Sequence, residues 1–82
     1  MRDIKIIWDF RGPAALKTAE HHAIHLKEYA ANCAIEYTTI DIQTFNEFYT
    51  IAFIVVKEKD MLSVRDALKP HRAEVYIKKR RD

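Results

Sequence analysis

Residues 49–56 read Tyr-Thr-Ile-Ala-Phe-Ile-Val-Val, and every position in this stretch except Thr50 is apolar. A helix that crosses a membrane needs about 20 apolar residues, so this run is far too short for one. A short apolar run rich in β-branched side chains is typical of a strand that is covered on both faces. The stretch therefore predicts a central strand of a sheet.

Three other segments alternate between apolar and polar residues, as half-buried strands do. They are residues 4–10, residues 35–45 and residues 73–78. In the first of them, one face carries Ile4, Ile6, Trp8 and Phe10, and the other carries Lys5, Ile7 and Asp9. Asn46-Glu47 is the expected turn between the second strand and the third.

Two helices separate the strands. Residues 14–33 follow Pro13, which suits a first helical position, and they place apolar residues at helical spacing. This predicted apolar stripe consists of Leu16, Ala19, Ala23, Leu26, Ala30 and Cys33. Asp60 is the expected cap of a second helix over residues 61–69, which Pro70 ends.

The predicted order β-α-β-β-α-β covers residues 1–82 and resembles the ferredoxin-like (split β-α-β) superfold. This resemblance implies an α+β domain with a four-stranded antiparallel sheet, the first and third strands in the middle, and both helices on one face. No family-specific motif accompanies the pattern. Because the superfold hosts many unrelated functions, it does not indicate what the chain does.

Composition limits the remaining possibilities. The chain is 49% hydrophobic, which suffices for one core, and Cys33 is its only cysteine. It can therefore form no disulfide within itself and no four-cysteine zinc site, so we expect a reducing, cytoplasmic environment. The net charge is +2, but residues 1–77 hold 10 Lys and Arg against 11 Asp and Glu. The basic character thus comes from the tail at residues 78–82.

The face of the sheet that points away from the helices is expected to have an apolar centre inside a charged border. Such a patch on a small protein usually marks an interaction surface. We therefore expect a homodimer that packs face to face, and the alternative is a monomer whose third strand is covered by its own tail or loops. The residues expected in the dimer face are Ile7, Ile51, Phe53, Val55 and Tyr76.

A histidine cluster in the first helix is a candidate metal site. His21 and His25 lie one helical turn apart and Glu28 continues the same side, so the three could act as ligands. The order of these residues differs from the His-Glu-x-x-His pattern of metalloproteases, because Glu20 precedes the first histidine. The alternative is a solvated helix face that is rich in histidine.

A small-molecule pocket between the sheet and the helices is a second candidate site. Its expected residues are Arg11, His22 and Trp8. Arg11 precedes a helix N-terminus, where an anion could bind, although Gly12-Pro13 also fits a simple turn. No cofactor is expected, because the stretch matches neither the phosphate-binding loop nor the dinucleotide pattern. His22 also fits a structural role at the helix–sheet contact.

The sequence therefore favours a non-catalytic binding module over an enzyme. Cys33 is expected in the core and Ser63 on the surface, and no pattern pairs either with a histidine. The alternative is a small dimeric enzyme or ligand-binding protein of the α/β-barrel type, and an RNA-binding or metal-binding domain is a third possibility. RNA binding is disfavoured because residues 49–54 lack the glycines and the basic residue of the RNA-binding strand motif.

Overall fold

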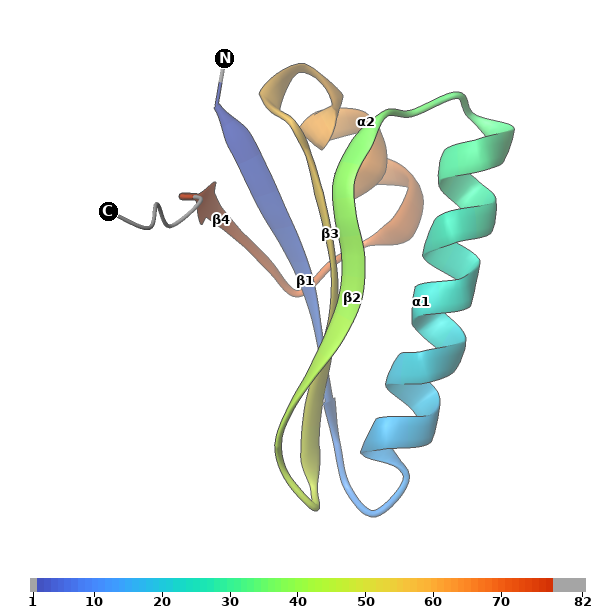
Figure 1. Ribbon diagram of the computed structural model, residues 1–82, viewed down its shortest axis with the longest axis vertical. Helices are drawn as coiled ribbons and strands as arrows, with labels where there is room; N and C mark the ends of the chain where they lie inside the picture. The colour runs from blue at the N-terminus through green and yellow to red at the C-terminus, as the bar shows by residue number, and fades with distance from the viewer. Residues whose placement is uncertain (1, 78–82) are drawn as a thin grey trace.

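The computed structural model describes residues 2–77 and has the predicted order of elements (Figure 1). The basic tail at residues 78–82 lies outside the described residues. The elements are β1 (Asp3–Arg11), α1 (Ala15–Asn32), β2 (Tyr37–Asn46), β3 (Tyr49–Lys57), α2 (Glu58–Leu68) and β4 (Arg72–Tyr76).

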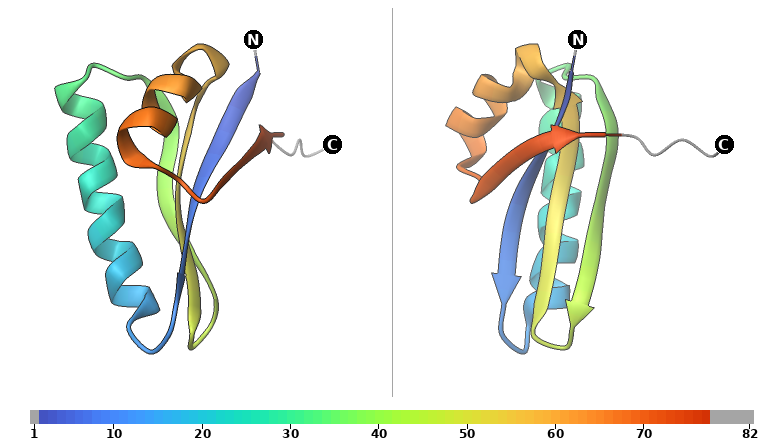
Figure 2. Two further views of the ribbon diagram at one scale, coloured as in Figure 1. Left: turned by 180° about the vertical axis from the view of Figure 1, so that it is seen from behind. Right: turned by 90° about the vertical axis from the view of Figure 1, so that its left-hand side faces the viewer.

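The four strands form one antiparallel sheet in the order β2-β3-β1-β4, so β1 and β3 occupy the middle as predicted. Ile6 pairs with Ile54, and the pairing of β1 with β4 extends from Asp3 opposite Tyr76 to Ile7 opposite Arg72. Both helices lie on one face of the sheet and leave the other face open (Figure 2). Within residues 2–77, no helix is long and apolar enough to cross a membrane.

The core fills the space between the helices and the sheet. Ile6 and Ile54 from the sheet meet Leu26 from α1 and Val64 from α2, and all four are fully buried. Trp8 joins this core, and its indole N–H donates a hydrogen bond to the carbonyl of Leu68 at 3.1 Å. The alternation predicted for residues 4–10 thus directs one apolar set toward the helices.

The predicted stripe of α1 is partly wrong. Leu16 is 47% exposed and Cys33 is exposed, whereas the fully buried positions of the helix are Ala15, Ala19, Leu26 and Ala30. Each residue turns a helix by about 100°, so a contact line that starts at Ala15 moves Leu16 to the flank. Alanine at several contact positions lets the helix backbone approach the sheet closely.

The predicted start of α2 is also wrong, because the helix begins at Glu58 and Asp60 lies in its first turn. The N–H of Glu58 donates to the carbonyl of Arg2 at 3.0 Å, so main chain just before β1 satisfies the first amide of the helix. The two carboxylates of the first turn favour the helix electrostatically. The helix ends at Leu68, and Lys69 takes the left-handed conformation with φ 50°.

The hairpin between β2 and β3 turns one residue later than predicted, at Glu47-Phe48. The side-chain oxygen of Asn46 accepts the N–H of Phe48 at 2.8 Å and thereby closes the turn. β2 begins at Tyr37, and the register shifts near each of its ends, so the regular part of its pairing lies in between.

Candidate functional site

The open face of the sheet carries the outward side chains of all four strands, among them the five residues of the predicted dimer face. Ile7, Ile51 and Val55 form its aliphatic centre and are 1%, 2% and 0% exposed. Phe53 and Tyr76 are half-buried. The three aliphatic side chains are therefore already sealed within one chain, and rings and charged groups make up the accessible surface.

Cross-strand neighbours explain this seal. Ile7 lies between Phe53 on β3 and Arg72 on β4. The ammonium group of Lys5 lies 4.3 Å from the centre of the Phe53 ring, which is cation–π contact distance. Long side chains such as those of lysine and arginine cover apolar surface with their stems while their charged ends stay in water.

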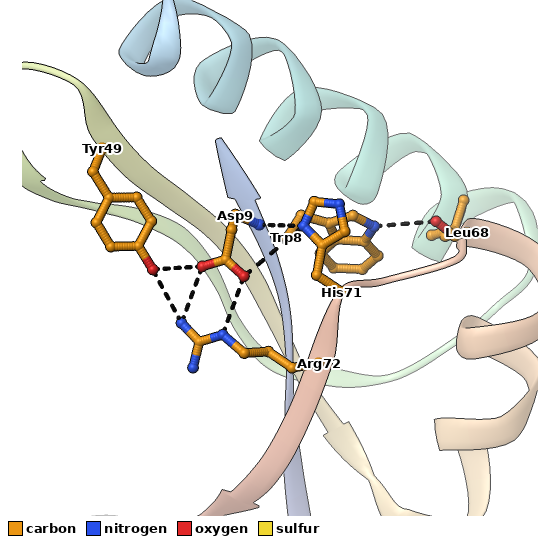
Figure 3. Close-up of polar contacts among 6 residues, drawn as sticks. All are labelled: Trp8, Asp9, Tyr49, Leu68, His71 and Arg72. Carbon is orange, nitrogen blue, oxygen red and sulfur yellow. Dashed lines mark hydrogen bonds and ion pairs between the residues drawn. The ribbon is translucent and has the colours of Figure 1, made fainter. Parts of the chain in front are cut away.

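An ion-pair cluster joins β1, β3 and β4 at one part of the open face (Figure 3). The carboxylate of Asp9 accepts two hydrogen bonds from Arg72, one from Nε to Oδ2 and one from Nη2 to Oδ1, both at 3.1 Å. The hydroxyl of Tyr49 donates to the same Oδ1 at 2.5 Å. Both oxygens of Asp9 are thus engaged, so this carboxylate is not placed to act as a general base.

The electrostatics of the cluster agree with its geometry. The hydrogen bonds from Arg72 lower the pKa of Asp9 below its usual value, and the Tyr49 hydroxyl adds to this effect against an opposing contribution from burial. The same partnership raises the pKa of Arg72. Since the Asp9 side chain is only 18% exposed, its charge is compensated by its neighbours more than by water.

His71 extends the pairing between β1 and β4 by one residue. Its main-chain N–H donates to the carbonyl of Ile7 at 3.0 Å, and its Nδ1 accepts the N–H of Asp9 at 2.7 Å. The imidazole Nδ1 therefore accepts a hydrogen bond that a main-chain carbonyl of the neighbouring strand would normally accept. The dashed line in Figure 3 marks this contact. An Nδ1 that accepts leaves the proton of the neutral ring on Nε2.

The ring of Tyr49 lies in an aromatic cluster near the β2–β3 hairpin. The Arg11 guanidinium carbon lies 4.0 Å from the centre of this ring, and Phe45 stacks on the ring with centroids 4.9 Å apart. Phe48 in the turn is 56% exposed, and its carbonyl accepts the N–H of Gly12 at 2.8 Å. The hairpin end of the sheet therefore presents an arginine and several rings.

The three predicted pocket residues do not come together. Trp8 and His22 pack against each other on the helix side of the sheet, with ring centroids 4.6 Å apart, and Phe10 lies 5.5 Å from His22. Arg11 reaches the other face, where it contacts Tyr49. Among residues 2–77, the Nε2 of His22 is buried and has no hydrogen-bond partner.

The pH dependence of stability should report on His22. Burial lowers its pKa, and the charges of His25 and His71 lower it further. The unfolded chain therefore takes up a proton first as the pH falls below about 6.5, and folding stability declines there until the folded protein is protonated too. We expect His22→Leu to remove this decline in urea titrations between pH 7 and pH 5. His25→Leu should keep most of the decline, because burial is the larger cause of the lowered pKa of His22. An unaltered slope in His22→Leu would refute the assignment.

The predicted metal ligands lie on an exposed stretch of α1. The Nδ1 of His25 lies 3.3 Å from a carboxylate oxygen of Glu28, and both side chains are largely exposed. His21 instead lines a groove between α1 and β2. Across the described part of the chain, no three histidine, cysteine, aspartate or glutamate side chains are grouped as a metal ion requires.

The groove between α1 and β2 has a volume of about 400 Å³. Its apolar lining comes from both elements, and Ile24 on α1 is 54% exposed. The lining residues are Glu20, His21, Ala23, Ile24, Lys27, Ile40, Asp41 and Ile42. Since β2 is an edge strand, the groove runs beside an edge of the sheet.

Histidine, cysteine and serine are among the side chains most often used in acid–base and nucleophilic catalysis. Among the hydrogen bonds of residues 2–77, the one that involves a histidine ring runs from the main-chain N–H of Asp9 to the Nδ1 of His71. Cys33 and Ser63 are exposed, and neither is hydrogen-bonded to a histidine there. Comparison with models of protein families gives no match, and neither do comparisons with curated proteins and with solved structures.

Proposed function

We propose that this chain is a non-catalytic binding module that pairs with a second copy through the open face of its sheet. The observation that carries the proposal is that both helices cover one face of the sheet (Figure 2), while the other face presents partly exposed rings from β2, β3 and β4. Phe45, Phe53 and Tyr76 supply these rings. Aromatic side chains are enriched at the centres of protein interfaces.

Charge on the open face is compatible with self-association. Lys5 and Arg72 lie there beside Asp41 and Glu74, so both signs are present. In a twofold dimer each patch meets its own copy, and a patch with both signs can place opposite charges across the dyad.

We place the protein in the cytoplasm, because its single cysteine allows no disulfide within the chain.

The solution mass of the double variant Phe53→Gln/Tyr76→Gln tests this proposal. Removing both rings should lower the mass measured by light scattering by a factor of two at concentrations where the native protein is associated. Leu62→Gln serves as the matched control, because Leu62 is exposed on α2 away from the sheet. A double variant with the native mass would refute the face contact, and so would a mass that falls when a chelator is added.

A further inference from the structure

We propose that the free edge of β2, together with the adjoining face of α1, binds the same edge of a second copy. The two sheets would join into one antiparallel sheet with α1 packed against its copy. This contact uses a different surface from the open face and does not depend on it. It is inferred from the edge of β2 that no strand of residues 2–77 pairs with, the exposed apolar groove and the distribution of charge along α1.

The middle of β2 presents regular backbone at this edge. The register with β3 shifts between Tyr37 and Thr39 and again between Thr44 and Asn46, and it is regular in between. The N–H of Ile42 donates to the carboxylate of Asp41 at 2.8 Å, which shows that this amide points away from β3. Alternate residues of an antiparallel strand direct their main-chain groups to opposite sides, so Ile40 also faces the edge.

The edge amides therefore need a partner that β3 does not supply. Unpaired strand edges readily pair with other strands, and natural proteins normally protect them. Here the Asp41 carboxylate provides a local acceptor at one amide. A dyad at Ile42 would place Asp41 opposite Gln43 of the second copy, where the amide can take over as hydrogen-bond donor to the carboxylate.

Helix packing is compatible with this arrangement. α1 contacts both β2 and β3, and neighbouring strands lie about 4.8 Å apart. A helix above the β2–β3 boundary would lie about 5 Å from the dyad and thus about 10 Å from its copy, which is the usual distance between packed helices. Ile24, which is 54% exposed, would then be covered by the second helix.

The charges that flank Ile24 are self-complementary. Glu20 precedes it by one helical turn and Lys27 follows it by about one turn, and all three line the groove. In two antiparallel helices related by a dyad near Ile24, each Glu20 meets Lys27 of the other chain. This complementarity is why a second copy is the occupant that we propose.

A charge-swap experiment tests the helix contact. Glu20→Lys should weaken self-association about tenfold, because each of two symmetry-related ion pairs becomes a repulsion. Glu20→Lys/Lys27→Glu should restore it, since the swapped charges attract again across the dyad. The two residues are two turns apart within one helix, so a rescue diagnoses contact between chains. Lys59→Glu on α2 is the control and should change nothing.

Amide hydrogen exchange followed by NMR tests the strand contact. The amides of Ile40 and Ile42 should gain protection as protein concentration rises, whereas those of Asp41 and Gln43 should be protected at every concentration because they face β3. Exchange of Ile40 that does not depend on concentration, or a charge swap without rescue, would overturn the proposal and leave the edge to a different protein. If the solution mass falls only in Phe53→Gln/Tyr76→Gln, the result supports the contact through the open face alone. If it falls only in Glu20→Lys, the result supports the contact through the β2 edge alone.

Discussion

Replacement of Trp8 by alanine is expected to remove a large part of the free energy of unfolding. The side chain is 4% exposed, packs on His22, and donates a hydrogen bond to the Leu68 carbonyl. Truncating a buried tryptophan to alanine costs about 3–5 kcal/mol. A domain of this size has roughly 4–12 kcal/mol in total. Urea unfolding followed by circular dichroism should show this loss.

Two further variants test whether the loss of stability comes from the burial of Trp8 or would follow from the removal of any aromatic ring. Trp8→Phe keeps an aromatic ring in the core but leaves the Leu68 carbonyl without its indole donor, so its stability should fall between those of the native protein and Trp8→Ala. Phe48→Ala removes a ring that is 56% exposed and should cost under about 1 kcal/mol. If Trp8→Ala unfolded at the same urea concentration as Phe48→Ala, the placement of Trp8 in the core would be wrong.

The second large effect is expected for Asp9→Asn. This variant removes a carboxylate that accepts two hydrogen bonds from Arg72 and one from Tyr49. A hydrogen bond to a charged group contributes about 1.5–3 kcal/mol, and partial exposure of Arg72 reduces the benefit, so we expect a loss of about 2 kcal/mol at pH 7. The midpoint of urea unfolding measures it.

The pH dependence of this loss provides an independent check. The pKa of Asp9 is lowered in the folded state, so its stabilisation is complete above the unfolded value of about 3.9. It disappears as the pH falls through the lower folded pKa, and the difference between native protein and Asp9→Asn should shrink there. Asp66→Asn is the control, because Asp66 is exposed and its partner among residues 2–77 is its neighbour Arg65. A difference that stays constant down to pH 2 would contradict the role of the Asp9 charge.

The order of elements along the chain was predictable because each strand and helix has its own pattern in the sequence. Residues 49–56 are apolar on both faces, and this indicated the central position that β3 occupies. Residues 4–10 alternate, and this placed Trp8 on the helix side. These patterns are local, so they need no knowledge of which strands pair.

The Asp9 cluster was not predictable in the same way. Asp9 was visible as an outward residue, but Arg72 and His71 follow it by more than 60 residues, and only the register of β1 with β4 brings them together. Register depends on how α2 ends and on the length of the connection after it. A search for an outward acid and an outward base near the ends of neighbouring strands could have named Arg72 as a candidate, but not His71.

The stripe of α1 was ambiguous for a different reason. Leu16 and Ala15 are adjacent apolar residues, so two apolar lines that share Ala19, Leu26 and Ala30 fit the spacing equally well. The sheet contacts select the line through Ala15. This line leaves Leu16 and Cys33, which belong to the alternative line, exposed on the flank of the helix.

The position of β1 in the sheet has a consequence for biosynthesis. Of the four strands β1 is made first, yet its two neighbours, β3 and β4, are the last strands to be made (Figure 1). A nascent chain that has reached only β2 holds two strands that do not pair with each other. The sheet can therefore assemble only after β3 has left the ribosome, and the Asp9–Arg72 ion pair only after β4 has followed. Folding of this domain thus waits for the synthesis of β3 and β4, and β1 remains exposed to chaperones until then.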